Sequence, residues 1–288
     1  MADALHAPVL VSEVVRLMAG AATVLDLTVG AGGHAAALLE AGVDRVVGSD
    51  RDPDALEASR QRLAWAGPRF TAVAGTFSDI ERIAAEAGVR AVDGILYDLG
   101  VSSLHLDRPE RGFSYRSPGP LDMRMGPGER TAADVVNTYP EEELSRVIFE
   151  LGEERHARRI AGAIVRARTR APLQDTGELA RIVAGAVPKR RGGPHPARRT
   201  FQAIRIEVNR ELEELTASLP RAVSLLAPGG RVVVISYHSL EDRIVKRFFL
   251  GEERLEVLTK KPVTPSAAEA GRNPRARSAK LRAARRAA

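Results

Sequence analysis

The chain has 288 residues, a net charge of +6 and 44% hydrophobic residues, which suits one large domain or one domain with an insertion. It contains no cysteine, which excludes disulfides, thiolate metal sites, iron–sulfur clusters and a cysteine nucleophile. The sequence shows neither an apolar run of the roughly 18 residues that a membrane span needs nor a signal-peptide pattern in its first residues, so we expect a cytoplasmic protein.

In the first hundred residues, apolar segments alternate with helix-like segments. Four buried strands are predicted at Val24–Thr28, Arg45–Asp50, Arg69–Ala74 and Val92–Asp98. Helices are expected from about Ser12, at 35–41, after the N-cap Asp52 with Pro53 in the first turn, and at 79–87. This alternation predicts an α/β fold with a doubly wound, Rossmann-like sheet.

Residues 107–130 interrupt this alternation, because they are rich in Gly, Pro, Arg and Asp. A loop of this length is usually functional or disordered, and its place after the end of a strand favours a substrate-side loop. From Pro140 the apolar residues recur at helical spacing, as in Leu144, Val147, Ile148 and Leu151, and we assign 131–206 to a helical insertion. We therefore expect a small helical domain inserted into a sheet domain formed by 1–106 and 207–288.

The last third of the chain is expected to return to the sheet. Apolar residues from Phe201 to Leu215 predict one long helix that Pro220 should kink or split. The remaining predicted elements are a turn at Leu226–Gly230, a fifth strand at Arg231–Ser236, a helix at Leu240–Phe249, a sixth strand at Leu255–Thr259 and a seventh near Ser278–Leu281.

Residues 264–288 are predicted as a basic C-terminal tail. From Gly271 to Ala288 there are seven basic residues and no acid. The charge alone leaves two interpretations open, a solvated and partly disordered tail or a surface that contacts a polyanion such as nucleic acid. For the second, we expect contacts with phosphates rather than with bases.

A glycine-rich turn follows the first predicted strand. Gly30-Ala31-Gly32-Gly33-His34-Ala35 fits the dinucleotide pattern G-x-G-x-x-G/A, and Asp50 lies where an acid would hold a ribose. An NAD-dependent oxidoreductase is therefore one candidate. This motif alone does not decide which ligand binds there.

Three acids favour S-adenosyl-L-methionine instead. Asp26 lies four residues before Gly30, Asp50 is followed closely by Asp52, and Asp98 ends the fourth strand. An acid would repel a diphosphate, whereas it attracts the ammonium and sulfonium charges of a methyl donor. The alternative for each acid is an N-cap or an exposed turn residue.

The absence of cysteine limits which atoms can accept the methyl group, because methylation of a pyrimidine ring carbon generally needs a cysteine nucleophile. An amine or hydroxyl is expected, and a base amine would need an N–H acceptor and an in-line approach. Asp98, or the backbone carbonyls of Asp98 and Leu99, are the candidate acceptors. Aromatic rings that could sandwich a flipped base are Phe113, Tyr115, Tyr237 and His238, although a strand-end aromatic often simply packs on a helix.

Ten segments along the chain then carry a resemblance to a known family: His6–Leu10, Gly30–His34, Asp50–Pro53, Asp93–Ser103, Arg111–Ser114, Gly119–Met125, Gly152–Arg155, Arg199–Ile206, Ser239–Lys246 and Asn273–Ser278. In this order they resemble the bacterial small-subunit rRNA cytosine-N4 methyltransferase family (methyltransferase H, also called MraW). The resemblance covers nearly the whole chain and implies a class I methyltransferase sheet. It also implies N4-methylation of a cytosine in the decoding region of 16S rRNA, on the assembled small subunit.

The resemblance also implies which residues hold S-adenosylmethionine: Gly32, Gly33, His34, Asp50, Phe77, Asp98 and His105. The residue argument adds Asp26 and Gly30 to these. At the position of His105 we expect the family often to carry glutamine. No metal is expected, and monomer and homodimer both stay open.

The sequence also suggests candidates for the catalytic residues and for the residues that contact RNA. The run Asp98–Val101 lacks the prolines and aromatic residue of DNA amino-methyltransferases, so a base-stacking group must come from elsewhere. The catalytic candidates are Asp98, Tyr237 and His238. The RNA-contact candidates are Phe113, Arg124, Arg190, Arg199, Arg243, Lys246, Arg275 and Arg277. A non-catalytic RNA-binding protein that uses the basic segments is the third hypothesis.

Overall fold

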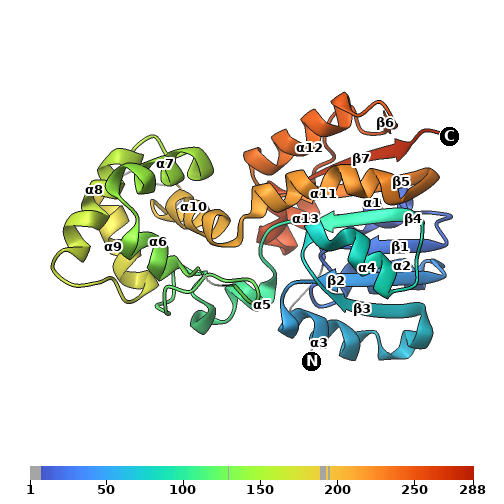
Figure 1. Cartoon of the computed structure of the whole chain (residues 1–288), viewed down its shortest axis with the longest axis horizontal. Helices are drawn as coiled ribbons and strands as arrows, with labels where there is room; N and C mark the ends of the chain where they lie inside the picture. Colours follow the sequence, from blue (N-terminus) through green and yellow to red (C-terminus); the bar gives the residue numbers. More distant parts are fainter. Residues whose placement is uncertain (1–7, 129, 189–192, 194) are drawn as a thin grey trace. The chain divides into compact units, whose positions relative to one another are not determined.

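A computed structural model describes residues 8–128, 130–188, 193 and 195–288. The chain divides into two units, one formed by Met1–Gly100 with Leu212–Ala288 and the other by Val101–Glu211 (Figure 1). Each unit is described by itself. Within the described residues, no helix is long and apolar enough to cross a membrane.

The described part of the first unit contains a seven-stranded sheet in the order β3-β2-β1-β4-β5-β7-β6. Its strands are β1 (Thr23–Asp26), β2 (Arg45–Asp50), β3 (Phe70–Ala74), β4 (Val92–Asp98), β5 (Leu226–Ser236), β6 (Leu255–Val257) and β7 (Lys280–Arg286). The pairs from β3 through β5 are parallel, whereas β7 is antiparallel to both β5 and β6. Parallel strands that are buried on both faces are apolar along their length, which is why the sequence predicted β2 and β4 with these bounds.

Helices cover both faces of this sheet. They are α1 (Val11–Leu17), α2 (Gly33–Glu40), α3 (Pro53–Arg62), α4 (Ile80–Glu86), α11 (Glu211–Leu225), α12 (Ser239–Gly251) and α13 (Ala267–Arg272), with short 3-10 helices at Ala64–Arg69, Phe77–Asp79 and Pro274–Ser278. Neighbouring residues of one strand belong to different core clusters, Val24 packing with residues of α1 and α2, and Leu25 with residues of α4 and α11. Two apolar cores on opposite faces confirm the predicted doubly wound α/β fold.

The second unit is helical and has one apolar core. Its helices are α5 (Ser103–Leu106), α6 (Ala132–Thr138), α7 (Glu141–Gly152), α8 (Ala157–Arg168), α9 (Thr176–Ala186) and α10 (Arg198–Asn209), with a 3-10 helix at Pro109–Arg111. The sequence missed α6, whose start is fixed by a capping box between Thr131 and Asp134. The segment predicted as a separate loop packs into the same core through Phe113, Leu121, Met123 and Met125.

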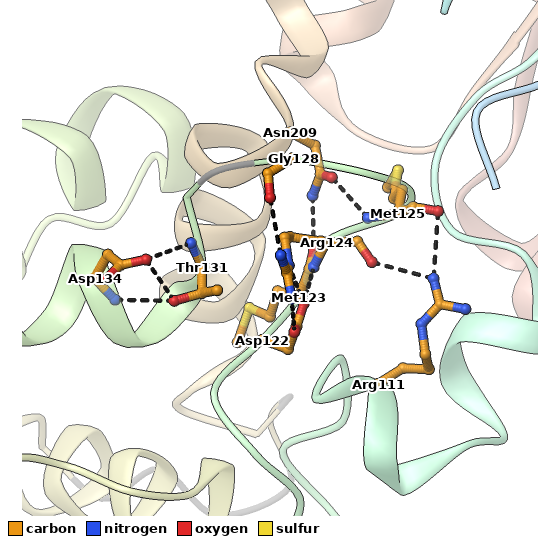
Figure 2. Close-up of polar contacts among 9 residues, drawn as sticks. All are labelled: Arg111, Asp122, Met123, Arg124, Met125, Gly128, Thr131, Asp134 and Asn209. Carbon is orange, nitrogen blue, oxygen red and sulfur yellow. Dashed lines mark hydrogen bonds and ion pairs between the residues drawn. The ribbon is translucent and has the colours of Figure 1, made fainter. Parts of the chain in front are cut away.

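A buried asparagine holds this 107–130 segment in place (Figure 2). Asn209 donates from Nδ2 to the Met123 carbonyl at 2.8 Å and accepts from the Met125 amide at 2.9 Å. Met123 is buried with a φ of 61°, a left-handed conformation that costs a non-glycine residue energy. The two Asn209 contacts offset this strain, so the segment has a defined backbone.

Arginine side chains complete this network (Figure 2). Arg124 binds Asp122 through two hydrogen bonds of 3.0 and 2.7 Å and donates to the Gly128 carbonyl at 2.8 Å. Burial raises the pKa of Asp122, but the Arg124 contacts outweigh it and keep that pKa below its usual value. Arg111 donates to the carbonyls of Arg124 and Met125. Arg124, predicted as an RNA contact, therefore fixes the loop.

Replacement of Asn209 by alanine is expected to lower the free energy of unfolding by about 1–3 kcal/mol, because it leaves a buried carbonyl and a buried amide without partners. Asn137 is the matched control, since it also bridges a carbonyl and an amide, both of Leu173, but is only half-buried. Chemical denaturation of both variants tests this. A loss at Asn209→Ala no larger than that at Asn137→Ala contradicts the role of Asn209.

The prediction of one long helix with a kink at Pro220 is wrong. The helix breaks at Arg210, where φ is 52°, and α11 continues through Pro220. A proline removes one backbone donor inside a helix, but Pro220 and Thr216, whose carbonyl loses that donor, are both exposed to water.

The segment 264–288, predicted as a basic tail, contains the seventh strand that was expected near Ser278–Leu281. Residues 280–286 form β7 inside the sheet, and β5 begins at Leu226 rather than after a turn. Arg282 is 7% exposed and its Nε lies 2.6 Å from Asp242 Oδ1, while Lys280 contacts the same carboxylate at 3.4 Å. These basic side chains stabilise the fold, so the expected phosphate contacts of 272–286 do not include Arg282.

Candidate active site

The glycine turn connects β1 to α2 as the sequence indicated. Gly30 and Gly32 have φ angles of 51° and 78°, which favour glycine at both positions. A Cβ at Gly32 would lie 3.0 Å from the Leu63 side chain, and one at Gly33 would lie 3.0 Å from Pro8. The backbone therefore packs too closely against Leu63 and Pro8 to carry a side chain at Gly32 or Gly33 without a shift of these neighbours.

Asp50 braces this turn from the end of β2. Its Oδ2 accepts from the Gly30 amide at 3.0 Å, and its Oδ1 accepts from the Asp52 amide at 2.9 Å. Asp52 in turn caps α3 by accepting from the Asp54 amide, as predicted for a residue before Pro53. Asp50 is thus placed at the carboxyl end of its strand, where α/β sheets bind ligands, and its ribose contact stays a prediction.

Asp26 is the most unusual acid of the site. It is 1% exposed, and its Oδ1 accepts from the Thr28 amide at 3.1 Å. Its Oδ2 has no hydrogen-bond partner among the described residues. Burial raises its pKa to about 7, although the nearby His34 opposes that shift. A buried carboxylate oxygen without a partner points to a polar or cationic ligand.

His34 lies on the first turn of α2 between two of the acids. It is 5% exposed, and its Nε2 is 3.4 Å from Asp98 Oδ2. Burial lowers its pKa, but the hydrogen bond and the charge of Asp98 outweigh burial and raise it above its usual value. Nδ1 has no hydrogen-bond partner in the described part of the chain. His34 therefore brings a second unsatisfied buried atom to the site.

Asp98, at the end of β4, is fixed from three sides. The Tyr237 hydroxyl donates to its Oδ1 at 2.8 Å, and its backbone amide donates to Thr28 Oγ1 at 2.6 Å. Burial and the charge of Asp98 raise the pKa of Tyr237 well above its usual value. Tyr237 is therefore a permanent donor and cannot serve as a base. The sequence did not link these residues, although adjacent strands β4 and β5 both end here.

His238 follows Tyr237 but has a different role. It is the N-cap residue of α12, and its side chain and that of Glu241 form a reciprocal capping box. The amides of Tyr237 and His238 both donate to Glu241 Oε2. His238 therefore caps α12 in this structure, and its catalytic and base-stacking roles stay predictions.

The remaining aromatic candidates separate between the units. Phe77, in the first unit, follows β3, is half-buried and packs edge-on against Tyr97 at 5.7 Å. In the second unit, His105 and Phe113 are both buried and stack on each other at 4.8 Å. A buried core ring cannot stack on an RNA base, so the assignment of Phe113 is corrected. The contacts of Phe77 and His105 with the cofactor stay predictions.

Most other candidates for RNA contact are exposed. Arg190 lies outside the described residues. Arg199 is exposed on α10 and donates to the Glu153 carbonyl at 3.0 Å. Four more basic side chains are exposed on the first unit, namely Arg243, Lys246, Arg275 and Arg277. Exposure is compatible with phosphate contacts, which stay predictions for these five residues.

Comparison with known proteins decides the family. A sequence profile described as the MraW methylase family matches residues 3–287. The chain belongs to the MraW methylase family. It is 53% identical over 285 residues to ribosomal RNA small subunit methyltransferase H of Deinococcus deserti, covering 98% of this chain and 93% of that one. The enzyme of the same name from Methylobacterium sp. is 51% identical over 310 residues, with coverages of 99% and 92%.

This membership in the MraW methylase family confirms the resemblance and the expected methyltransferase. Among solved structures, an rRNA methylase from Streptococcus thermophilus matches with a TM-score of 0.44 and 11% identity, covering 96% of this chain and 94% of that one. Oxidoreductase chemistry at the glycine turn is set aside, because the family transfers methyl groups.

Proposed function

We propose that this member of the MraW methylase family uses S-adenosyl-L-methionine to methylate the N4 amino group of a cytosine in the decoding region of 16S rRNA. The substrate is the assembled small ribosomal subunit, which places the reaction in the cytoplasm. The main support for S-adenosylmethionine as the methyl donor is Asp26 Oδ2, which is buried and has no hydrogen-bond partner among the described residues. The names of relatives about half identical to this chain support the rRNA substrate.

The residues around the turn fit the methyl donor. Asp26 and His34 bring two buried polar atoms without partners, which suits the ammonium and carboxylate of the methionine end. Asp50 is placed for the ribose and Phe77 for the adenine ring. Gly30, Gly32 and Gly33 allow close approach to the backbone. When bound, the donor supplies a methyl group on a positively charged sulfur.

Asp98 is proposed to position the accepting amine. The N4 amine of cytosine is a poor nucleophile because its lone pair is delocalised into the ring, so an acceptor for its N–H must orient it. Asp98 lies at the carboxyl end of β4 and is 22% exposed, so its carboxylate is accessible. The Tyr237 hydroxyl fixes that carboxylate, and Thr28 Oγ1 holds the backbone amide of the same residue. Tyr237 acts through Asp98 and is a positioning residue.

A methyl-transfer assay tests this function. Small subunits from a strain without the endogenous methyltransferase are incubated with the protein and radiolabelled donor, and the rRNA is digested to nucleosides. We expect the label in N4-methylated cytidine of 16S rRNA. A known rRNA methyltransferase serves as the positive control. Label absent from the rRNA under conditions where that control is active refutes the proposed function, and label in another nucleoside refutes the cytosine N4 assignment.

A further inference from the structure

A groove in the first unit lies between α12 and the β6–β7 edge of the sheet (Figure 1). Its cavity volume is about 330 Å³. It is lined by side chains that are basic or mostly apolar, namely Lys246, Phe249, Leu250, Val257, Thr259, Lys260 and Arg282. None of these is an acid, so the lining has a positive charge.

The two lysines of the groove have no ion-pair partner in the part of the chain that the structure describes. Lys246 and Lys260 are exposed, and among the described residues neither forms an ion pair. Arg282 differs, because Asp242 neutralises it. The nearest acid on the strands, Glu256, pairs with Arg285. Since side chains alternate along a strand, Glu256 faces away from the side that carries Val257, and the groove keeps its positive charge.

Apolar surface is exposed between these charges. Leu250 of α12 is 67% exposed, and Val257 of β6 is half-buried. Phe249 also lines the groove, but it is buried and anchors α12 in the core. A single exposed leucine is common, but Leu250 lies beside other apolar lining residues and two exposed lysines, which gives the groove an apolar centre and cationic flanks.

The walls of this groove are held in place. The Leu258 amide donates to the Ala283 carbonyl at 3.0 Å, and the Ala283 amide donates to Thr259 Oγ1 at 2.9 Å. On the other side, Asp242 ties α12 to β7 through Arg282 and Lys280. A preformed surface binds its partner with less loss of conformational entropy.

We propose that this groove binds a single-stranded segment of the rRNA substrate, with Lys246 and Lys260 contacting phosphates and Leu250 contacting a base. Single-stranded nucleic acids combine anionic phosphates with apolar base faces, and proteins hold them with cations beside apolar or aromatic surfaces. This inference rests on the proposed function, because it assigns a second contact to the same substrate. It adds Lys260 and Leu250 to the residues that the sequence suggested.

Charge reversal tests the phosphate contacts. The variant Lys246→Glu/Lys260→Glu is compared with Arg62→Glu/Arg90→Glu, which changes the net charge equally at exposed positions outside the groove. For the groove variant we expect KM for unmethylated small subunits to rise about tenfold or more, kcat to stay unchanged, and the salt dependence of binding to fall by a slope of about 1–2. A groove variant that behaves like the control refutes the inference.

A photocrosslink identifies the occupant. Because the chain has no cysteine, Leu250→Cys places a single thiol that can carry a photoreactive maleimide, and Arg62→Cys is the matched control. Crosslinking of 16S rRNA from position 250 but not from 62 supports the inference, and crosslinking of a ribosomal protein alone overturns it. Unlabelled wild-type protein is assayed for methylation in parallel. If it methylates the subunit while the groove variants behave as controls, the groove fails and the proposed function stands.

Discussion

Replacement of Asp98 by alanine is expected to lower kcat for methyl transfer by about 10²–10⁴-fold, the range in which a positioned proton acceptor contributes. The substitution removes the carboxylate proposed to accept from the amine and leaves the Tyr237 hydroxyl and His34 without their contacts to Asp98. Single-turnover methylation of small subunits at saturating donor measures this effect. Saturation matters because Asp98 is also assigned to the donor site.

Two further variants separate the charge of Asp98 from its position. Asp98→Asn keeps an oxygen that can accept from Tyr237 but removes the negative charge, so we expect nearly the full loss of kcat. Tyr237→Phe keeps the charge and removes one positioning contact, so a smaller loss is expected, with donor affinity unchanged. Thermal unfolding controls for folding. Wild-type kcat in a folded Asp98→Ala variant would show that a backbone carbonyl or the donor alone positions the amine.

The central strands could be predicted because their signal is local. β2 and β4 are buried along most of their length, so small and apolar residues occupy the middle of each strand, and each ends in the acid that the sequence marked. The glycine turn follows the same logic, since positive φ angles and close backbone approach both select glycine. Features that depend on one segment alone can therefore be predicted from the sequence.

The elements that were mispredicted depend on partners far along the chain. The sequence predicted a strand near Ser278–Leu281 within a basic tail, but it could not show that Asp242, forty residues earlier, neutralises Arg282 inside β7. The segment 107–130 was predicted as a substrate-side loop without any indication of its order, and Asn209 fixes its backbone from another helix. Composition cannot show such pairings, because they form only when the fold brings both partners together.

In the candidate site too, local features could be predicted from the sequence, whereas contacts between distant residues could not. The three acids were identified from their places at strand ends, but the missing partner of Asp26 and the Tyr237–Asp98 contact follow from which strands lie side by side. The order β1-β4-β5 brings the ends of these strands to one edge of the sheet. The capping role of His238 was not predicted, because it depends on the contact between this residue and Glu241 on the next helix.

Asp26 gives the site a pH dependence with a defined sign. Its pKa is about 7 in the protein without ligand because of burial, so it gains a proton as the pH falls through 7. Only the ionised form attracts the ammonium of the methionine end. The dissociation constant for S-adenosylhomocysteine, which keeps that ammonium, is therefore expected to rise by up to about tenfold per pH unit below 7. Isothermal titration calorimetry from pH 5.5 to about 8.5 measures it.

Asp26→Asn separates the effect of this group from that of His34, whose pKa Asp98 raises above its usual value. The variant should bind the ligand about 10–100-fold more weakly at pH 8 and lose the part of the pH dependence that comes from Asp26. Although the variant should bind the ligand more weakly, its free energy of unfolding without ligand should be higher than that of the wild type. A raised carboxyl pKa costs the wild type stability as the pH rises from about 4 to 7, so the ligand-free variant should be more stable than wild type at pH 8. Unchanged ligand affinity, or lower stability at pH 8, would show that Asp26 is neutral or already paired in the functional protein.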